Sequence, residues 1–232
     1  LEVVTEIRKK NWFERYRWFM TTDGFLTIGG RDAASNSAVI RKHLDKNDKV
    51  FHGDIFGSPF FILKDAENVP DTTMNEIAHA TVCFSRAWRE ALYGVSAYWV
   101  LPDQVKKSAP SGEFLPKGSF TIEGQRNFIK SETLKLAVGI IQLEDNDHVL
   151  TCGPPEAIKK NSICYAIIEP NGLEMAECAK KIRLEFLKIF EDITRKINID
   201  EFVRALPAGK SQIKEISLGD LEKEKFIDNE LD

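Results

Sequence analysis

A histidine and an aspartate stand two residues apart in the apolar stretch KVFHGDIFG. Side chains alternate between the two faces of an extended strand. We expect Phe51 and Ile55 to point into a core. His52, Asp54 and Phe56 would then share the opposite face, near the end of a sheet. These three residues could form a recognition patch, or the polar pair could serve only neighbouring backbone groups, and spacing does not decide between the two.

Catalysis by this pair is weakly supported. His52 and Asp54, together with Ser85, supply the residue types of a hydrolase triad. However, Ser85 lies in CFSRAW, inside an expected helix, and no Gly-x-Ser-x-Gly elbow surrounds it. A metal site built from His52, Asp54 and His79 has no better support. The four cysteines form no Cys-x-x-Cys pair, so we expect buried free thiols in a reducing compartment.

Two glycines precede an expected helix in the stretch TIGGRDAASN. Backbone N–H groups at a helix start attract phosphate. The stretch is neither Gly-x-Gly-x-x-Gly nor a P-loop, so a nucleotide site is weakly indicated. Asp32 is expected to cap the helix. Arg31 could pair with a nucleic-acid phosphate or with a neighbouring carboxylate.

Positive charge gathers in two segments. The first is the helix expected at 33–44 and its exit, with Arg41, Lys42, Lys46 and Lys49. The second is the segment 103–130, with Lys106, Lys107, Lys117, Arg126 and Lys130 between Phe114, Phe120 and Phe128. Basic side chains with interleaved aromatic rings are typical of surfaces that follow an RNA strand, although a charge run is more often a solvated face.

Composition is that of an ordinary soluble globular protein, with 232 residues, 43% of them hydrophobic and 29% charged. No apolar run approaches the roughly 20 residues of a membrane helix. The net charge of −4 argues against a plainly basic nucleic-acid binder. The acidity is concentrated after residue 140, however, so the first part can still present a basic face.

The pattern predicts an α+β fold, with a mixed or antiparallel sheet and one long covering helix. Apolar alternation around Asp23-Gly24 predicts a hairpin. The covering helix should run from a capping box at Thr73 and Glu76 to Gly94. After Asp147 the sequence pattern changes to an expected strand, short helix, strand and long helix, which predicts a small appended α/β unit.

Three stretches resemble the RNA-binding domain of the NFACT family. They are FLTIGGRDAASN, KVFHGDIFGSPFFILKD and the long run from ATVCFSRAW through APSGEFLPKGSFTIEG to NFIK. The resemblance covers about residues 15–142. It divides the chain into the end of a coiled-coil helix (1–14), this domain (15–144), a small α/β C-terminal extension (145–212) and an acidic tail (213–232).

The family motifs carry over residue by residue. Arg31, Asp32 and Asn36 match a Gly-Arg-Asp and Asn signature, and Ser85 matches a Ser-x-x-Trp helix motif. The strand motif of the family is His-Ala-Asp-x-His-Gly, so Phe56 here replaces a second histidine and favours an aromatic contact. The residues assigned to RNA contact are Arg31, Asp32, Asn36, Arg41, Lys42, Lys46, His52, Asp54, Phe56, Ser85, Lys106, Lys107, Lys117, Arg126, Asn127 and Lys130.

The resemblance implies a binding module rather than an enzyme, without cofactor or metal and without a membrane partner. It would belong to a longer cytoplasmic protein that binds obstructed large ribosomal subunits, through rRNA and ribosomal proteins. Such proteins hold tRNA and support mRNA-independent tailing of stalled nascent chains. The alternative is a protein-interaction module that docks on ribosomal proteins or quality-control partners. An enzyme acting on RNA would instead need His52 and Asp54 for turnover.

Overall fold

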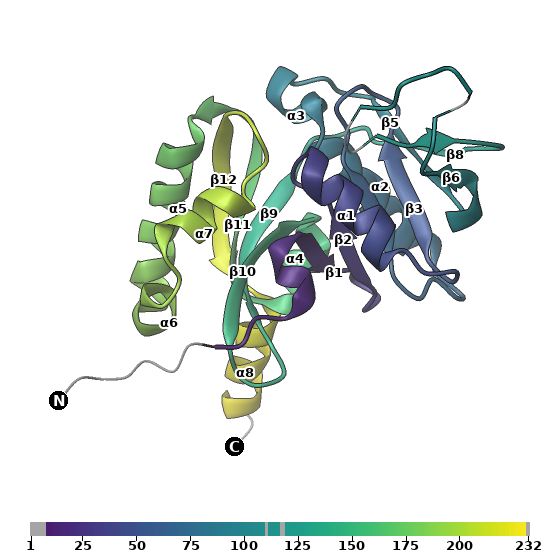
Figure 1. The fold of residues 1–232 in the computed structure, drawn as a ribbon. Coiled ribbons are helices and arrows are strands. Elements are labelled where there is room, and N and C mark those ends of the chain that lie inside the picture. The colour runs from purple at the N-terminus through teal and green to yellow at the C-terminus, as the bar shows by residue number, and fades with distance from the viewer. Residues whose placement is uncertain (1–7, 110, 117–118, 231–232) are drawn as a thin grey trace.

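The structure is a computed structural model that describes residues 8–109, 111–116 and 119–230. A six-stranded sheet and a four-stranded sheet lie side by side, with helices packed on them (Figure 1). All strand pairs in both sheets are antiparallel. The expected α+β class is therefore confirmed, and the sheet is antiparallel rather than mixed.

The first part of the chain forms the six-stranded sheet, in the order β1-β2-β4-β3-β5-β8. Its strands are β1 (Arg17–Met20), β2 (Leu26–Gly29), β3 (Lys49–Gly53), β4 (Phe60–Leu63), β5 (Ser96–Val100) and β8 (Asn127–Lys130). Its helices are η1 (Trp12–Arg15), α1 (Ala33–His43), α2 (Asp71–Cys83), α3 (Arg86–Glu90) and η2 (Pro102–Gln104). A separate two-stranded ribbon consists of β6 (Val105–Lys106) and β7 (Thr121–Ile122).

The second part forms the four-stranded sheet, in the order β10-β9-β11-β12. Its strands are β9 (Leu136–Gln142), β10 (His148–Gly153), β11 (Ser162–Leu173) and β12 (Ser211–Leu218). Its helices are α4 (Pro155–Asn161), α5 (Met175–Ile189), α6 (Glu191–Arg195), α7 (Ile199–Ala205) and α8 (Asp220–Glu230). Because its strands are antiparallel, this C-terminal unit is α+β and not the α/β arrangement that the sequence suggested.

The predicted hairpin is present, and its turn also fixes the first long helix. Gly24 has a φ of +89°, a conformation that side chains disfavour. The carboxylate of Asp23 accepts hydrogen bonds from the hydroxyls of Thr72 and Thr73, at 2.8 and 2.7 Å. The carboxylate of Glu76 accepts the backbone N–H of Thr22 at 3.0 Å. The expected capping box is therefore absent, because both of its residues bind the hairpin turn.

The covering helix is interrupted at a point where the sequence pattern predicts one continuous helix. α2 ends at Cys83, and Ser85 starts α3 as its N-cap, with its hydroxyl accepting the backbone N–H of Ala87 at 3.1 Å. The same hydroxyl donates to the carbonyl oxygen of Val82 at 2.6 Å. Apolar residues keep helical spacing across this break, which explains why periodicity alone predicted one helix.

The two faces of the first sheet have different neighbours. Lys49 and Trp99 line a hollow with Met74 and Asn75 of α2, so α2 covers their face. Side chains alternate along a strand, so His52 and Tyr98 point to the opposite face. The start of α1 lies on that second face, and α1 and α2 are seen on opposite sides of the sheet in Figure 1.

The structure places the unit boundaries differently from the sequence. β9 is the second strand of the four-stranded sheet, so the break expected at residue 144 falls inside a hairpin. Residues 213–218, which were expected to begin the acidic tail, belong instead to β12, paired with β11. Of the helix expected at 1–14, residues 8–11 are not helical and residues 12–15 form only a 3-10 turn. Residues 1–7 lie outside the described part.

The two sheets share one continuous hydrophobic core. Phe19 of β1 packs so closely on Gly153 of β10 that a Cβ at Gly153 would lie 2.9 Å from its ring. The indole N–H of Trp88 reaches the carbonyl oxygen of Lys210 at 3.2 Å. The two parts therefore pack together as one body. None of the helices in the described part of the chain combines the length and the hydropathy that a membrane span requires.

Candidate nucleic-acid interface

A cleft of about 670 Å³ opens on the face of the first sheet that α2 leaves uncovered. Its floor is formed by β3, β4 and β5, and one wall is the start of α1. The loop between β6 and β7 forms the other wall, and Ala208 of the C-terminal unit closes one end. Its volume falls in the range of about 300–1,000 Å³ typical of small-ligand sites.

The glycine pair explains how α1 comes so close to the sheet. A Cβ on Gly30 would lie within 1.9 Å of the Asn36 side chain. Asn36 accepts the backbone N–H of Phe60 through its Oδ1 at 3.1 Å, which ties α1 to β4. Asp32 caps α1, as expected, by accepting the N–H of Ser35 at 2.8 Å. Asp32 and Asn36 thus line the cleft while holding its wall in place.

Arg31 enters the cleft at the start of α1. Its guanidinium donates to the carbonyl oxygens of Arg204 and Tyr16. Its Nε atom is buried and has no hydrogen-bond partner. Burial, and secondarily the charge of Arg204, lowers the pKa of Arg31 to about 10, so it remains a cation at neutral pH. Arg31 therefore adds a positive charge to the lining of the cleft.

Arg17 is a second cation on the cleft, and sequence reasoning did not find it. Its guanidinium donates to the carbonyl oxygens of Ala205 and Leu206, at 3.1 and 3.2 Å, and lies 4.3 Å from the ring centre of Phe84. Burial lowers the pKa of Arg17 to about 9. These hydrogen bonds run to main-chain carbonyl groups, which carry no net charge. Positive charge therefore remains to attract an anion.

An aromatic row crosses the floor of the cleft. Its members, in register on β8, β5, β3 and β4, are Phe128, Tyr98, His52 and Phe60. Successive ring centres lie 5.5, 5.8 and 4.6 Å apart. Burial lowers the pKa of His52 to about 4, so its imidazole is neutral at pH 7 and can stack like its neighbours. Its Nδ1 lies 3.4 Å from the hydroxyl of Tyr98.

One cation lies over a ring within this row, and another lies beyond its Phe60 end. Arg126 lies over the ring of Tyr98, 4.8 Å from its centre. At the other end, Phe120 meets Phe60 edge to face at 5.6 Å, and Arg41 lies 5.4 Å from the centre of Phe120. Cations over aromatic faces are attracted by the ring electrons, and they present positive charge beside apolar surface.

Arg41 also holds the long loop that forms the second wall. Its Nη2 donates to the carbonyl oxygen of Lys107 at 3.3 Å. Lys106 on β6 faces Glu123 at 3.8 Å, an exposed pair of small energetic value. Lys107 is exposed at the rim. Lys117, which was expected to contact RNA, lies outside the described residues.

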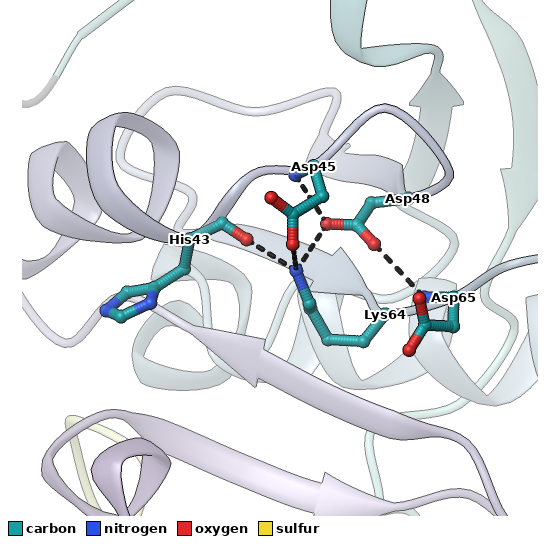
Figure 2. A network of polar contacts seen from close by, with 5 residues as sticks. All are labelled: His43, Asp45, Asp48, Lys64 and Asp65. Carbon is teal, nitrogen blue, oxygen red and sulfur yellow. Dashed lines mark hydrogen bonds and ion pairs between the residues drawn. The ribbon is translucent and has the colours of Figure 1, made fainter.

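An ion network built around the buried carboxylate of Asp48 fixes the exit of the basic helix (Figure 2). Lys64 Nζ lies 2.6 Å from Asp48 and 2.8 Å from Asp45, and it donates to the carbonyl oxygen of His43 at 2.6 Å. Asp48 also accepts the N–H of Asp65 at 3.0 Å. Burial opposes the charge of Lys64, but its hydrogen bonds to the two aspartates raise its pKa overall. The network sets the path of the segment that carries Lys46.

The structure brings together six of the residues that the sequence assigned to RNA contact. Those that line the cleft are Arg31, Asp32, Asn36, His52, Phe56 and Arg126. Arg41, Lys106 and Lys107 belong to the wall and its rim. Lys42 and Lys46 are exposed near the far end of α1, and Lys130 is exposed on β8, where it pairs with Glu132 at 3.2 Å.

Three expected site residues have other positions. β3 ends at Gly53, so Asp54 lies beyond the strand, is exposed and does not line the cleft with His52. Ser85 is buried and serves as a helix cap. Asn127 donates from its side chain to the carbonyl oxygen of Trp99 at 3.2 Å, which joins β8 to β5. In the described residues, no three histidine, cysteine or acidic side chains are arranged to hold a metal.

Comparison with protein families identifies the part of the chain that carries the cleft. Residues 15–124 match the model described as the NFACT protein RNA-binding domain. The chain belongs to the NFACT family. The matched NFACT domain contains α1, the strands β3, β4 and β5, and the loop wall of the cleft. The predicted resemblance is thus confirmed for the segment that builds the site.

Curated relatives extend the similarity beyond the NFACT domain. The chain is 36% identical over 215 residues to the archaeal Rqc2 homologue aRqcH of Methanocaldococcus jannaschii, covering 92% of this chain and 31% of that protein. It is 32% identical over 201 residues to the ribosome quality control complex subunit NEMF homologue of Drosophila melanogaster, covering 85% and 19%. The chain therefore spans about a third or less of these two relatives.

A solved structure also matches part of the chain. It is the C-terminal part of the fibronectin/fibrinogen-binding protein of Streptococcus suis, with 18% identity and a TM-score of 0.44. The match covers 56% of this chain and 49% of the solved chain.

Proposed function

We propose that this chain is the RNA-binding module of a ribosome quality control factor. The observation that carries the proposal is the cleft of the NFACT domain, where Arg17, Arg31 and Arg126 meet an aromatic floor. Phosphate oxygens would take the guanidinium N–H groups, and aromatic rings would contact bases or riboses. The names of the relatives supply the ribosomal setting.

A finer role can be proposed from what the family resemblance implies. The module would contact tRNA or rRNA on an obstructed large ribosomal subunit in the cytoplasm, beside ribosomal proteins. It would thereby support mRNA-independent tailing of the stalled nascent chain. Arg31 and Arg126 would face the RNA from within the cleft, and Lys107 would add charge at its rim.

The module would act by binding and not by catalysis. The two hydrogen bonds of the Ser85 hydroxyl run to the backbone of Val82 and Ala87. His52 faces Tyr98, and its low pKa keeps it uncharged. Asp54 lies beyond the strand end. This arrangement supports the binding role, because the candidate acid, base and nucleophile face different neighbours.

The test is a titration of labelled tRNA with the chain at about 50 and 200 mM salt. We expect affinity to fall roughly tenfold or more over this range, because each phosphate contact releases counterions. The variant R126A/K107A should weaken binding further. The variant K180A/K181A removes two exposed charges of α5, outside the cleft lining, and should bind like the wild type. Equal loss in both variants, or no binding at either salt, contradicts the proposal.

One observation favours the second candidate, a protein-docking role of the C-terminal unit. α5 exposes Leu184 and Ile189, which are 59% and 40% exposed. Contiguous exposed apolar surface is typical of contact sites, and Leu184 and Ile189 are the large apolar side chains of α5 that such a site would use. L184S/I189S should then abolish binding to isolated large ribosomal subunits while leaving the affinity for labelled tRNA unchanged. Wild-type subunit binding by this variant contradicts the docking role.

A further inference from the structure

The cleft carries aromatic surface that is open to a ligand. Phe56 lines it and is 85% exposed, at the loop that follows β3. His52 and Phe120 are partly exposed, while Phe60 and Tyr98 are packed beneath them at 4% exposure. An exposed phenyl ring gains no burial energy in the folded chain. Its position at a cleft fits a planar partner that covers it.

The charges of the cleft fit an anion that is joined to that planar partner. Arg31 and Arg126 both line the cleft, and Arg126 is exposed over the ring of Tyr98. Arg17 adds a third positive charge, held in place by α7 carbonyl groups. A nucleotide combines a planar base with an anionic phosphate. The cleft offers aromatic surface for the first and positive charge for the second within the volume of a small-ligand site.

The walls limit how much RNA can enter. α1 is tied to β4 through Asn36, and the loop wall is tied to α1 through Arg41. An A-form duplex presents stacked and paired bases whose faces are inaccessible to side chains. Aromatic stacking on a protein instead requires a base that has left its stack. The cleft therefore suits one extruded base better than a helix.

We infer that the cleft binds one unpaired nucleotide of an RNA strand, with its base against Phe56, His52 and Phe120 and its phosphate at Arg31 and Arg126. This inference rests on the RNA-binding function proposed above and deepens it. RNA would be selected by the presence of an accessible unpaired base, while the outer basic residues would contact neighbouring phosphates in any sequence.

The experiment compares two equally exposed phenylalanines. Phe56 lines the cleft, and Phe114, 87% exposed, does not, so neither substitution should disturb the core. Binding of a labelled unstructured RNA hexamer is measured with the full chain and with F56A, F56Y and F114A. We expect F56A to weaken binding about tenfold, within the range for loss of one base stack. F56Y, which keeps the aromatic ring, should bind the hexamer nearly as tightly as the wild type. F114A should change the affinity less than about twofold.

Competition separates this inference from the function on which it rests. Labelled tRNA is bound to the chain, and unlabelled hexamer or a blunt duplex of the same length is added. We expect the single strand to displace tRNA at lower concentrations than the duplex. Equal displacement, or equal effects of F56A and F114A, overturns the single-nucleotide site while RNA binding stands. Failure of the wild-type chain to bind tRNA at all overturns the proposed function itself.

Discussion

Arg17 on the first strand donates a hydrogen bond to the carbonyl oxygen of Ala205, 188 positions further along the chain and 3.1 Å away. Together with the bond to Leu206, this contact ties β1, beside the cleft, to the end of α7. The cleft thus belongs largely to the NFACT domain by sequence, but two of its cations, Arg17 and Arg31, are positioned by the C-terminal unit.

Removing Arg17 should loosen this tie. R17A leaves two carbonyl oxygens without their donor and a gap beside Phe84. We expect a loss of about 2 kcal/mol in the free energy of unfolding, measured by urea denaturation. R15A removes an exposed arginine two residues away and should cost less than about 0.5 kcal/mol. Equal stability of both variants would show that the tie contributes nothing.

Lys64 should be essential to the network in Figure 2. K64M leaves the Asp48 carboxylate, whose side chain is 0% exposed, without its cation. Breaking a buried pair from one side costs about 3–5 kcal/mol, so a loss near the lower end is expected in thermal or urea unfolding. K46M removes an exposed lysine from the same segment as a control. A K64M chain as stable as K46M contradicts the importance of the buried pair.

His52 should make stability depend on pH. Burial lowers its folded-state pKa from 6.5 to about 4, so the unfolded chain binds its proton more readily. The stabilisation that depends on neutral His52 is complete above pH 6.5 and is lost as pH falls toward 4. Between pH 7 and 5 the free energy of unfolding should fall about 2 kcal/mol more in the wild type than in H52Q. If the free energy of unfolding falls equally with pH in the wild type and in H52Q, groups other than His52 cause the pH dependence.

Arg41 should control the mobility of the loop wall. R41K keeps the charge but cannot reproduce the donor geometry toward the carbonyl of Lys107 and over Phe120. Amide hydrogen exchange at β6 and β7 should become several-fold faster, while exchange in α2 stays unchanged. K42A, an exposed neighbour on α1, serves as the control. Unchanged exchange in R41K would mean that other contacts hold the loop.

Local elements were predictable where turn residues or helix-capping residues mark their ends. Asp23-Gly24 gave the hairpin, and Asp32 marked the start of α1. The break at Ser85 was missed because a helix cap and a mid-helix serine look alike when apolar spacing continues through both. β9 was assigned to the wrong unit because an apolar strand does not reveal in its own residues which sheet it joins.

The candidate site was predictable in part. His52 was placed on the correct face by alternation, but Asp54 was not, because β3 ends one residue earlier. Tyr98 was missed because its place beside His52 depends on strand register across 46 positions. Arg17 was missed because its partners are carbonyl groups at the end of α7. Every residue has a main-chain carbonyl group, so the sequence does not show which ones accept a hydrogen bond.

The bonds from Arg17 and Arg31 to the end of α7 constrain the path of the backbone there, not the identity of residues 204–206. A substitution of exposed Arg204 leaves the contact intact as long as the helix still ends in the same place, whereas Ala205 and Leu206 are also held by the core in which they are buried. Insertions or deletions that shift this end would break it at once. Among distant relatives, the place where α7 ends should therefore be retained better than the identity of the residue Arg204 at that end.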